Sequence, residues 1–360
     1  MSLLSPFSLL RRLAPTGLRW LMWLAFVLAG VWSTMAVYYS NLPVPWLRGL
    51  ASVVYALSLI AILVRMRPPW LARAIFLAAF AAVMLWFLLI PPSNNRDWQP
   101  DVAVLPFAEV NGDRVTIHNI RNCDYQSETN YTVRHYDKTV DLAKLQSVDF
   151  YVVYWGSPNI AHTMMSFGFG GDDYVCFSIE TRKEKGEGYS AIKGLFRQFE
   201  LIYVLGDERD LVRLRTNYRH EQVYLYRLTS DLATARLVFL DYLKEVNRLH
   251  EQPEWYNAIT ANCTTLIRGH TKAYAQNTHF DWRILLNGRI DQMAYERKSL
   301  DQSLPFEQLK ARSLINERAQ AADQDSNFSK RIRQQLPGIT GAALRRPQIK
   351  SCPGLAIVQA

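Results

Sequence analysis

The first 95 residues contain no aspartate, glutamate or lysine. Their only charged side chains are seven arginines, which supply most of the formal net charge of +9 and leave +2 for the remainder (9 − 7 = 2). The excess of positive charge is therefore concentrated beside long apolar runs and does not indicate nucleic-acid binding. Arginine next to long apolar runs is the pattern of membrane topology.

The chain also lacks the short motifs of several common site types. It has no GxxxxGK[ST] phosphate loop, no GxGxxG that opens a helix and no HExxH pair. It has four cysteines, none in a CxxC pair, at Cys123, Cys176, Cys263 and Cys352. We therefore expect neither a metal nor an organic cofactor. All four cysteines follow the apolar region, where disulfides are permitted, and Cys123 is a candidate partner for Cys352.

Three apolar runs are long enough to cross a bilayer, at Trp20–Tyr38, Leu47–Leu63 and Trp70–Ile90. Arginines precede the first run and flank the turn between the second and third. The positive-inside bias then places the N-terminus and this turn in the cytoplasm, and everything after Pro91 in the periplasm of a Gram-negative cell. The first run is too long for a signal peptide and lacks a clear cleavage site, so we interpret it as a retained anchor.

The sequence beyond residue 95 favours an α+β domain, a mostly antiparallel sheet with helices after it. An Asn-Gly turn divides Ala108–Ile117 into a hairpin, and Gly170-Gly171 joins the strands Ile160–Phe169 and Tyr174–Glu180. Further strands are predicted at Tyr131–Tyr136, Val148–Trp155, Leu201–Leu205, Leu211–Arg215 and Glu221–Leu228. Helices are predicted from Ser230-Asp231 to His250, from Cys263 onward, over Pro305–Ala322 and over Phe328–Leu336. We divide the chain into a membrane anchor (1–95), a periplasmic domain (96–337) and a tail (338–360).

Cys263 is the first candidate for chemistry. Asn262 and the threonines beside it are ordinary capping residues, so Cys263 is predicted in the first turn of a helix. Unpaired backbone N–H groups and the positive end of the helix dipole stabilise a thiolate there. Most cysteines, however, are small buried hydrophobic residues, and that alternative stays open.

A cysteine nucleophile needs a base, and His162 is the candidate that has partners. Alternation along the predicted hairpin places His162, Ser178 and Glu180 on one face, where a serine or a glutamate can orient the imidazole. A sheet histidine that faces a helix-start cysteine is the layout of papain-like folds, and the order of histidine before cysteine is that of their circularly permuted members. The alternative is a half-solvated sheet face without a site.

The sequence resembles the Lnb-type N-terminal periplasmic domain family, named after an intramolecular lipoprotein transacylase, over about residues 110–335. The segments that carry the resemblance are Trp155–Met164 (WGSPNIAHTM), Ser178–Glu184 (SIETRKE), Arg213–Arg219 (RLRTNYR) and Trp255–Thr265 (WYNAITANCTT). A more distant similarity is to permuted NlpC-type cysteine enzymes. The resemblance implies that Cys263 is the nucleophile and His162 the general base, with Glu180 or Ser178 orienting His162. It does not imply the substrate of the namesake.

Three functions remain open at this point. The first is a cysteine-dependent acyltransferase or acyl hydrolase at the membrane surface, acting on membrane lipids or lipoproteins through a thioester. The second is a cysteine peptidase or amidase acting on peptidoglycan. The third is a non-catalytic scaffold domain of the cell envelope. No nucleic-acid partner is expected, and the predicted location is the bacterial inner membrane, multi-pass, with the C-terminal domain in the periplasm.

Overall fold

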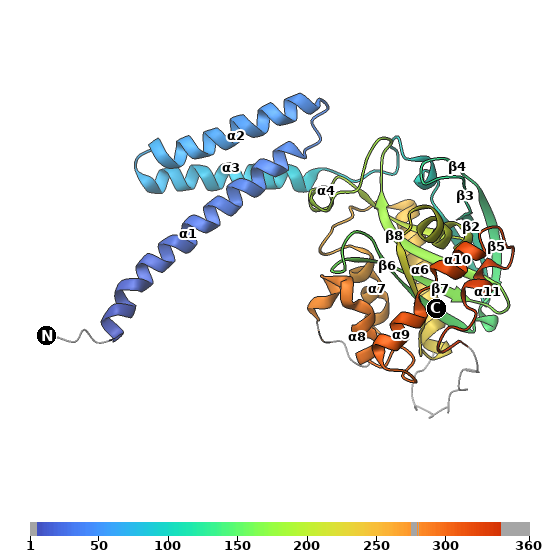
Figure 1. Ribbon diagram of the computed structural model, residues 1–360. Helices are drawn as coiled ribbons and strands as arrows, with labels where there is room; N and C mark the ends of the chain where they lie inside the picture. Colours follow the sequence, from blue (N-terminus) through green and yellow to red (C-terminus); the bar gives the residue numbers. More distant parts are fainter. Residues whose placement is uncertain (1–5, 275–278, 280, 340–360) are drawn as a thin grey trace, which may run out of the picture. The chain divides into compact units, whose positions relative to one another are not determined.

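The computed structural model describes residues 6–274, 279 and 281–339. The chain forms two compact units, and each has its own internal packing (Figure 1). The first, which we call the membrane unit, comprises Met1–Ser93 together with Ser190–Gln198. The second, the sheet unit, comprises Asn94–Tyr189 and Phe199–Ala360. The sequence division places the boundary at residue 95 instead of Ser93 and assigns Ser190–Gln198 to the periplasmic domain.

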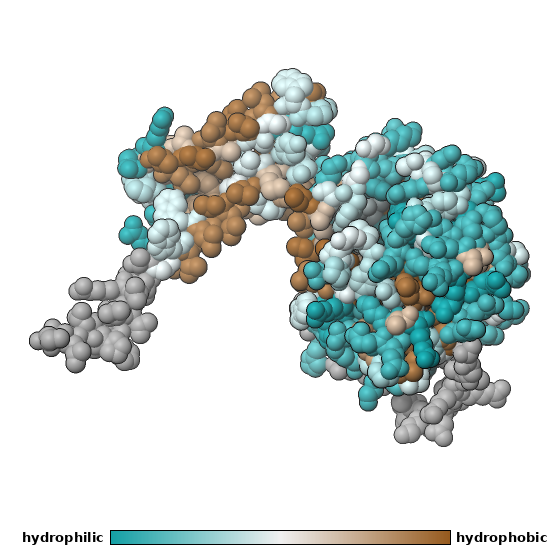
Figure 2. All heavy atoms as spheres, in the orientation of Figure 1, coloured by the Kyte–Doolittle hydropathy of each residue, from teal (hydrophilic) through white to brown (hydrophobic). Residues whose placement is uncertain are grey.

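Three long helices build most of the membrane unit: α1 (Pro6–Tyr38), α2 (Pro45–Arg65) and α3 (Pro69–Leu89). Each contains a span long and apolar enough to cross a membrane, as the three apolar runs predicted. Their outward surfaces are rich in apolar residues (Figure 2). The exposed leucines, valines and tryptophans on them need lipid rather than water as their surroundings.

A short segment far along the chain completes the membrane unit. Ser190–Gln198, which contains α4 (Ala191–Leu195), lies between two strands of the sheet in sequence yet packs against the long helices. Phe196 stacks on Tyr39 with ring centroids 5.3 Å apart. The Arg197 Nη1 atom donates to the carbonyl of Phe87 at 3.1 Å, at the end of α3. A cation at the C-terminal end of a helix satisfies carbonyls that have no partner within the helix.

The sheet unit is built on an eight-stranded sheet in the order β1-β2-β9-β8-β7-β6-β10, with β5 paired to β2. All its pairings are antiparallel except a single parallel bridge between β2 and β9. Its strands are β1 (Phe107–Asn111), β2 (Arg114–Arg121), β5 (His135–Asp141), β6 (Ser147–Tyr154), β7 (Ala161–Gly168), β8 (Tyr174–Arg182), β9 (Glu200–Gly206) and β10 (Gln222–Arg227). A separate two-stranded ribbon consists of β3 (Asp124–Tyr125) and β4 (Tyr131–Thr132).

Helices pack on both faces of this sheet. The first face, which we call the α7 face, carries α6 (Leu232–Glu251), α7 (Cys263–Lys272), α8 (Ile290–Glu296) and α9 (Phe306–Ser313) over one apolar cluster. The opposite face, the α5 face, carries α5 (Glu208–Arg213), α10 (Asn316–Ala321) and α11 (Phe328–Ile332) over a second cluster. Alternate side chains of the central strands supply the two clusters. The predicted α+β class is confirmed.

Three predicted elements were wrong. Tyr131–Tyr136 is not one strand, because it contains β4 of the ribbon and the start of β5 of the main sheet. Leu211–Arg215 is helical rather than a strand, because the Asp207 side chain caps α5. Arg213 and Arg215 of this segment are buried and form ion pairs. Pro305–Ala322 is two helices, α9 and α10, because Leu314 forms a β-bridge with Tyr224 between them.

Candidate functional site

His162, Ser178 and Glu180 come together on the α5 face of β7 and β8. Met164 pairs with Ser178, so the antiparallel register continues to bring His162 opposite Glu180. The His162 Nε2 atom lies 2.8 Å from Ser178 Oγ, and Ser178 donates to Glu180 Oε1 at 2.5 Å. Arg215, from the turn after α5, donates to the same carboxylate oxygen at 2.9 Å. The hydroxyl of Ser178 thus bridges the imidazole and the carboxylate.

The charges around this bridge decide the protonation of His162. Burial and then the Arg215 cation lower the pKa of His162 from 6.5 to about 3, so the imidazole is neutral. The Arg215 guanidinium outweighs burial and holds the pKa of Glu180 well below its usual range. Because Ser178 gives its single hydrogen to Glu180, its oxygen accepts from His162 Nε2–H. The lone pair of the ring, which is the basic position, is therefore on Nδ1.

Cys263 is the first residue of α7, as predicted. Its neighbour Asn262 is the N-cap, and a capping box joins Asn262 and Thr265, with the Asn262 side chain accepting from Thr265 N at 2.9 Å and Thr265 Oγ1 accepting from Asn262 N at 2.9 Å. The Cys263 side chain is 8% exposed, and its Sγ atom lies 3.8 Å from Thr264 Oγ1. The cap fixes the first turn, so the thiol lies beside unpaired backbone N–H groups of the helix start.

The structure does not bring Cys263 to His162. Cys263 packs in the apolar cluster of the α7 face, together with Ala161 and Met165 of β7. His162 projects from the same strand toward the α5 face, as Met164 does. Within the described part of the chain, no hydrogen bond joins the thiol to the imidazole. The expected arrangement, in which a sheet histidine faces the helix-start cysteine, is absent from this structure.

The Cys263 thiol and the His162 imidazole nevertheless lie at the same end of the sheet. Thr264 Oγ1, next to the thiol, lies 3.3 Å from Thr163 Oγ1, next to the imidazole. Asn287 joins the two elements, because its Nδ2 donates to Thr264 Oγ1 and to the carbonyl of Ala161, each at 2.6 Å. The helix start is thereby fixed to the first residues of β7.

Residues 131–288 match the family model of the Lnb N-terminal periplasmic domain. This stretch of the chain is similar to the Lnb-type domain. The match includes His162, Ser178, Glu180 and Cys263, and it confirms the predicted family. No curated protein and no solved structure matched, so the permuted papain-like assignment stays a prediction. Together with the three apolar helices, the similarity to the Lnb-type domain indicates a membrane-anchored protein of the cell envelope with a periplasmic domain.

A cavity of about 560 Å³ lies near this end of the sheet unit. The β6–β7 connection and the turn into β10 form its walls, and Lys310 of α9 reaches it from a third side. Tyr154 connects this wall to the start of α7. Its hydroxyl donates to the carbonyl oxygen of Gly288 at 2.9 Å, and the preceding residue, Asn287, donates to Thr264. The cavity is large enough for a small ligand.

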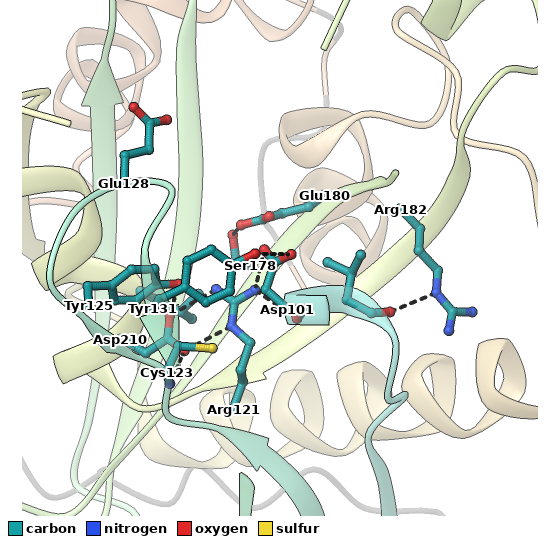
Figure 3. Close-up of polar contacts among 12 residues, drawn as sticks. Asp101, Arg121, Cys123, Tyr125, Glu128, Tyr131, Ser178, Glu180, Arg182 and Asp210 are labelled. Atoms are coloured by element: carbon teal, nitrogen blue, oxygen red, sulfur yellow. Dashed lines mark hydrogen bonds and ion pairs between the residues drawn. The ribbon is translucent and has the colours of Figure 1, made fainter. Parts of the chain in front are cut away.

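A second buried network of the sheet unit stabilises the end of β2, just before the two-stranded ribbon. Arg121 donates to both oxygens of Asp210 at 2.9 Å, and the same carboxylate accepts from Cys123 N at 2.7 Å (Figure 3). Burial raises the pKa of the Cys123 thiol to about 12. Cys123 is thus a thiol held by packing, as is Cys176 in the strand β8, and both are free. The predicted partner Cys352 lies outside the described residues.

Sequence reasoning missed two residues that hold the site. Arg215 falls in the predicted strand Leu211–Arg215, and its membership of the segment Arg213–Arg219 that carries the family resemblance is the signal that could have found it. Asn287 stands alone in a connection, and no local pattern points to its role. In the part of the chain that the structure describes, no group of three or more histidine, cysteine or acidic residues could hold a metal ion.

Proposed function

We propose that this protein is a membrane-anchored, cysteine-dependent acyltransferase or acyl hydrolase that acts on lipid or lipoprotein acyl groups at the periplasmic surface. Its proposed location is the bacterial inner membrane, with several spans and the N-terminus in the cytoplasm. The observation that carries the proposal is Cys263 at the first position of a capped helix, within the region that matches the Lnb family. Three apolar helices on the same chain raise the effective concentration of lipid substrates.

The proposed reaction has two acyl transfers. The Cys263 thiolate attacks an ester or amide carbonyl, the bond to the alcohol or amine breaks, and the acyl group remains on sulfur as a thioester. Water, a hydroxyl or an amino group then takes the acyl group and releases the thiol. The backbone N–H of Cys263 is the proposed donor to the oxyanion. His162 is the proposed base through Nδ1, with Glu180 and Ser178 orienting its ring. Because the pKa of His162 is about 3 in the arrangement described, this role requires that the imidazole gain the thiolate as a charged partner when the two groups meet.

Proton transfer from Cys263 to His162 needs a change of structure or a water relay at this end of the sheet, since the two side chains project to opposite faces. The proposal therefore has to be tested on the reactivity of the thiol itself. Full-length protein in nanodiscs is treated with a limiting thiol-reactive probe from pH 6 to pH 9, and labelled peptides are quantified by mass spectrometry. We expect Cys263 to label faster than Cys123 and Cys176 across this pH range.

The comparison is with His162→Ala, and with His250→Ala as a matched control on the exposed end of α6. We expect only His162→Ala to lower the labelling rate. A phospholipid with a radiolabelled acyl chain should leave a hydroxylamine-labile label on the Cys263 peptide, absent in Cys263→Ser. A silent Cys263, with no acyl label, would contradict the proposal. A label from an N-acylated muropeptide instead of lipid would favour the peptidoglycan amidase.

A second candidate is a non-catalytic domain of the cell envelope. The observation that favours it is the burial of Cys263 on the face opposite His162. In that case Cys263→Ala leaves the cellular function intact. Loss of function in this variant, with unchanged amount and melting temperature of the protein, excludes it.

A further inference from the structure

The cavity of about 560 Å³ in the sheet unit has a wall with an apolar surface. Trp155, in the connection after β6, is 38% exposed and lines the cavity together with Tyr154 and Tyr224. The rings of Tyr154 and Tyr224 meet edge to face with centroids 5.6 Å apart, which fixes this side of the cavity. A ligand with one apolar face can lie against the indole of Trp155.

A buried acceptor without a donor lies in the same cavity. The Glu221 Oε2 atom is buried and has no hydrogen-bond partner among the described residues. Its ion pair with Arg215 Nε is 3.9 Å long, which exceeds hydrogen-bond distance. The Glu221 side chain as a whole lines the cavity and is 13% exposed, so a ligand donor can approach its carboxylate and would stabilise it. Burial raises the pKa of Glu221, in accord with an incompletely compensated charge.

The backbone beside Glu221 is held in an uncommon conformation. His220, which also lines the cavity, has a φ of 53° in the left-handed region that side chains other than glycine rarely adopt. The hydrogen bond from Glu221 N to the carbonyl of Arg215 at 2.9 Å maintains this turn. Backbone strain of this kind concentrates where structure serves a ligand.

The charges of the cavity limit the class of ligand. The cation of Lys310 is already paired, at 2.8 Å, with the buried carboxylate of Asp291. A simple anion would meet Glu221, and a simple cation would meet Arg219, so neither is favoured. A neutral ring that bears hydroxyl donors on its edge and C–H groups on its face satisfies both Glu221 and Trp155.

We propose that this cavity is a saccharide-binding site, in which a pyranose ring lies against Trp155 and one of its hydroxyls donates to Glu221. The site goes beyond acyl transfer, since it uses none of the residues that the transfer requires. Its source of sugar is either a peptidoglycan fragment or the sugar headgroup of a glycolipid. Both present the same pyranose chemistry.

The test is equilibrium binding to full-length protein in a detergent without a sugar headgroup. The probes are tri-N-acetylglucosamine, a disaccharide muropeptide and a glucosamine-disaccharide glycolipid, followed by isothermal titration calorimetry. We expect binding of at least one, weakened about tenfold by Glu221→Ala and by Trp155→Ala, since each removes one anchoring contact. Preference between the muropeptide and the glycolipid identifies the source.

Three variants keep the result interpretable. Trp282→Ala removes a tryptophan that is 55% exposed outside the cavity and should leave the affinity unchanged. Trp155→Phe keeps an aromatic face and should retain most of the affinity that Trp155→Ala loses, which separates stacking from misfolding. Cys263→Ala should abolish acyl transfer and retain sugar binding, so the two proposals fail separately. Absence of binding to all three probes, or equal binding by a folded Trp155→Ala protein, would overturn the proposal.

Discussion

Acidification tests the protonation state of His162 directly. The pKa of this buried imidazole is lowered from 6.5 to about 3, so the unfolded chain binds a proton between these pH values and the folded chain does not. A lowered pKa of this kind contributes stability that is present above pH 6.5 and is lost as the pH falls toward 3. The loss is about 1.4 kcal/mol per pH unit, or about 2 kcal/mol between pH 6.5 and pH 5.

Other groups also titrate in this window, and Glu221, whose pKa is raised, acts in the opposite direction. The comparison is therefore between wild type and His162→Gln, in urea unfolding of the full-length protein at pH 6.5, 5.8 and 5. We expect the difference in unfolding free energy between them to shrink by about 2 kcal/mol over that range. The 14% exposure of the His162 side chain makes this value a ceiling.

Nitrogen NMR of the labelled imidazole is the independent measurement. It should show a proton on Nε2 and none on Nδ1 at pH 6, because Ser178 donates to Glu180 and can only accept from His162. A His162 that titrates near pH 6.5 would refute the burial argument. A proton on Nδ1 would refute the assignment of Nδ1 as the base.

Three other substitutions or treatments probe the supports of the site. Arg215→Met leaves the Glu180 carboxylate without its guanidinium and should lower the unfolding free energy by about 3–5 kcal/mol, with partial recovery when Glu180→Gln is added. Gly288→Ala places a Cβ 2.1 Å from the carbonyl oxygen of Pro158 and should lower the melting temperature, at a cost of about 1–3 kcal/mol. Because the pKa of Cys123 is raised to about 12, this thiol should react with iodoacetamide at pH 8 only after unfolding. Rapid labelling of folded protein at Cys123 would contradict its burial.

The hairpin and its polar face were predictable because both depend on short-range rules. Gly170 and Gly171 mark the turn, and a period of two then determines which side chains share a face. His162, Ser178 and Glu180 could therefore be grouped from the sequence alone. The helix start at Cys263 was predictable for the same reason, since Asn262 caps it locally.

The position of the helix that starts at Cys263 relative to the hairpin that carries His162 was not predictable. The helix α7 begins about 100 residues after His162, and the face of the sheet on which it packs depends on how long-range apolar surfaces meet. The partners Arg215 and Asn287 come from a misassigned helix and from an irregular connection, neither of which carries a periodic signal. A pattern rule can place a residue on a face, but it cannot say which helix covers that face.

Energetics indicate how Cys263 and His162 would come together if they act as a pair. A one-residue slip of β7 would turn His162 to the α7 face, but it would also move Met165 and Phe167 out of their apolar cluster and bring Ser166 into it, at about 1–3 kcal/mol for each misplaced side chain. Release of the first turn of α7 costs only a few hydrogen bonds of about 1 kcal/mol each, among them the one from Asn287 to Thr264. We therefore predict that pairing of Cys263 with His162 requires movement of the helix start and not of β7.

This reasoning predicts that Asn287→Ala increases the labelling rate of Cys263, because it removes the bonds that fix Thr264 to the start of β7. Asn327→Ala, at an exposed position before α11, is the matched control and should leave the rate unchanged. The additional substitution His162→Ala distinguishes simple exposure from pairing. If the faster labelling depends on His162, the released thiol reaches the imidazole; if it does not, the thiol is merely uncovered. An unchanged rate in Asn287→Ala would show that Asn287 does not control access to the thiol.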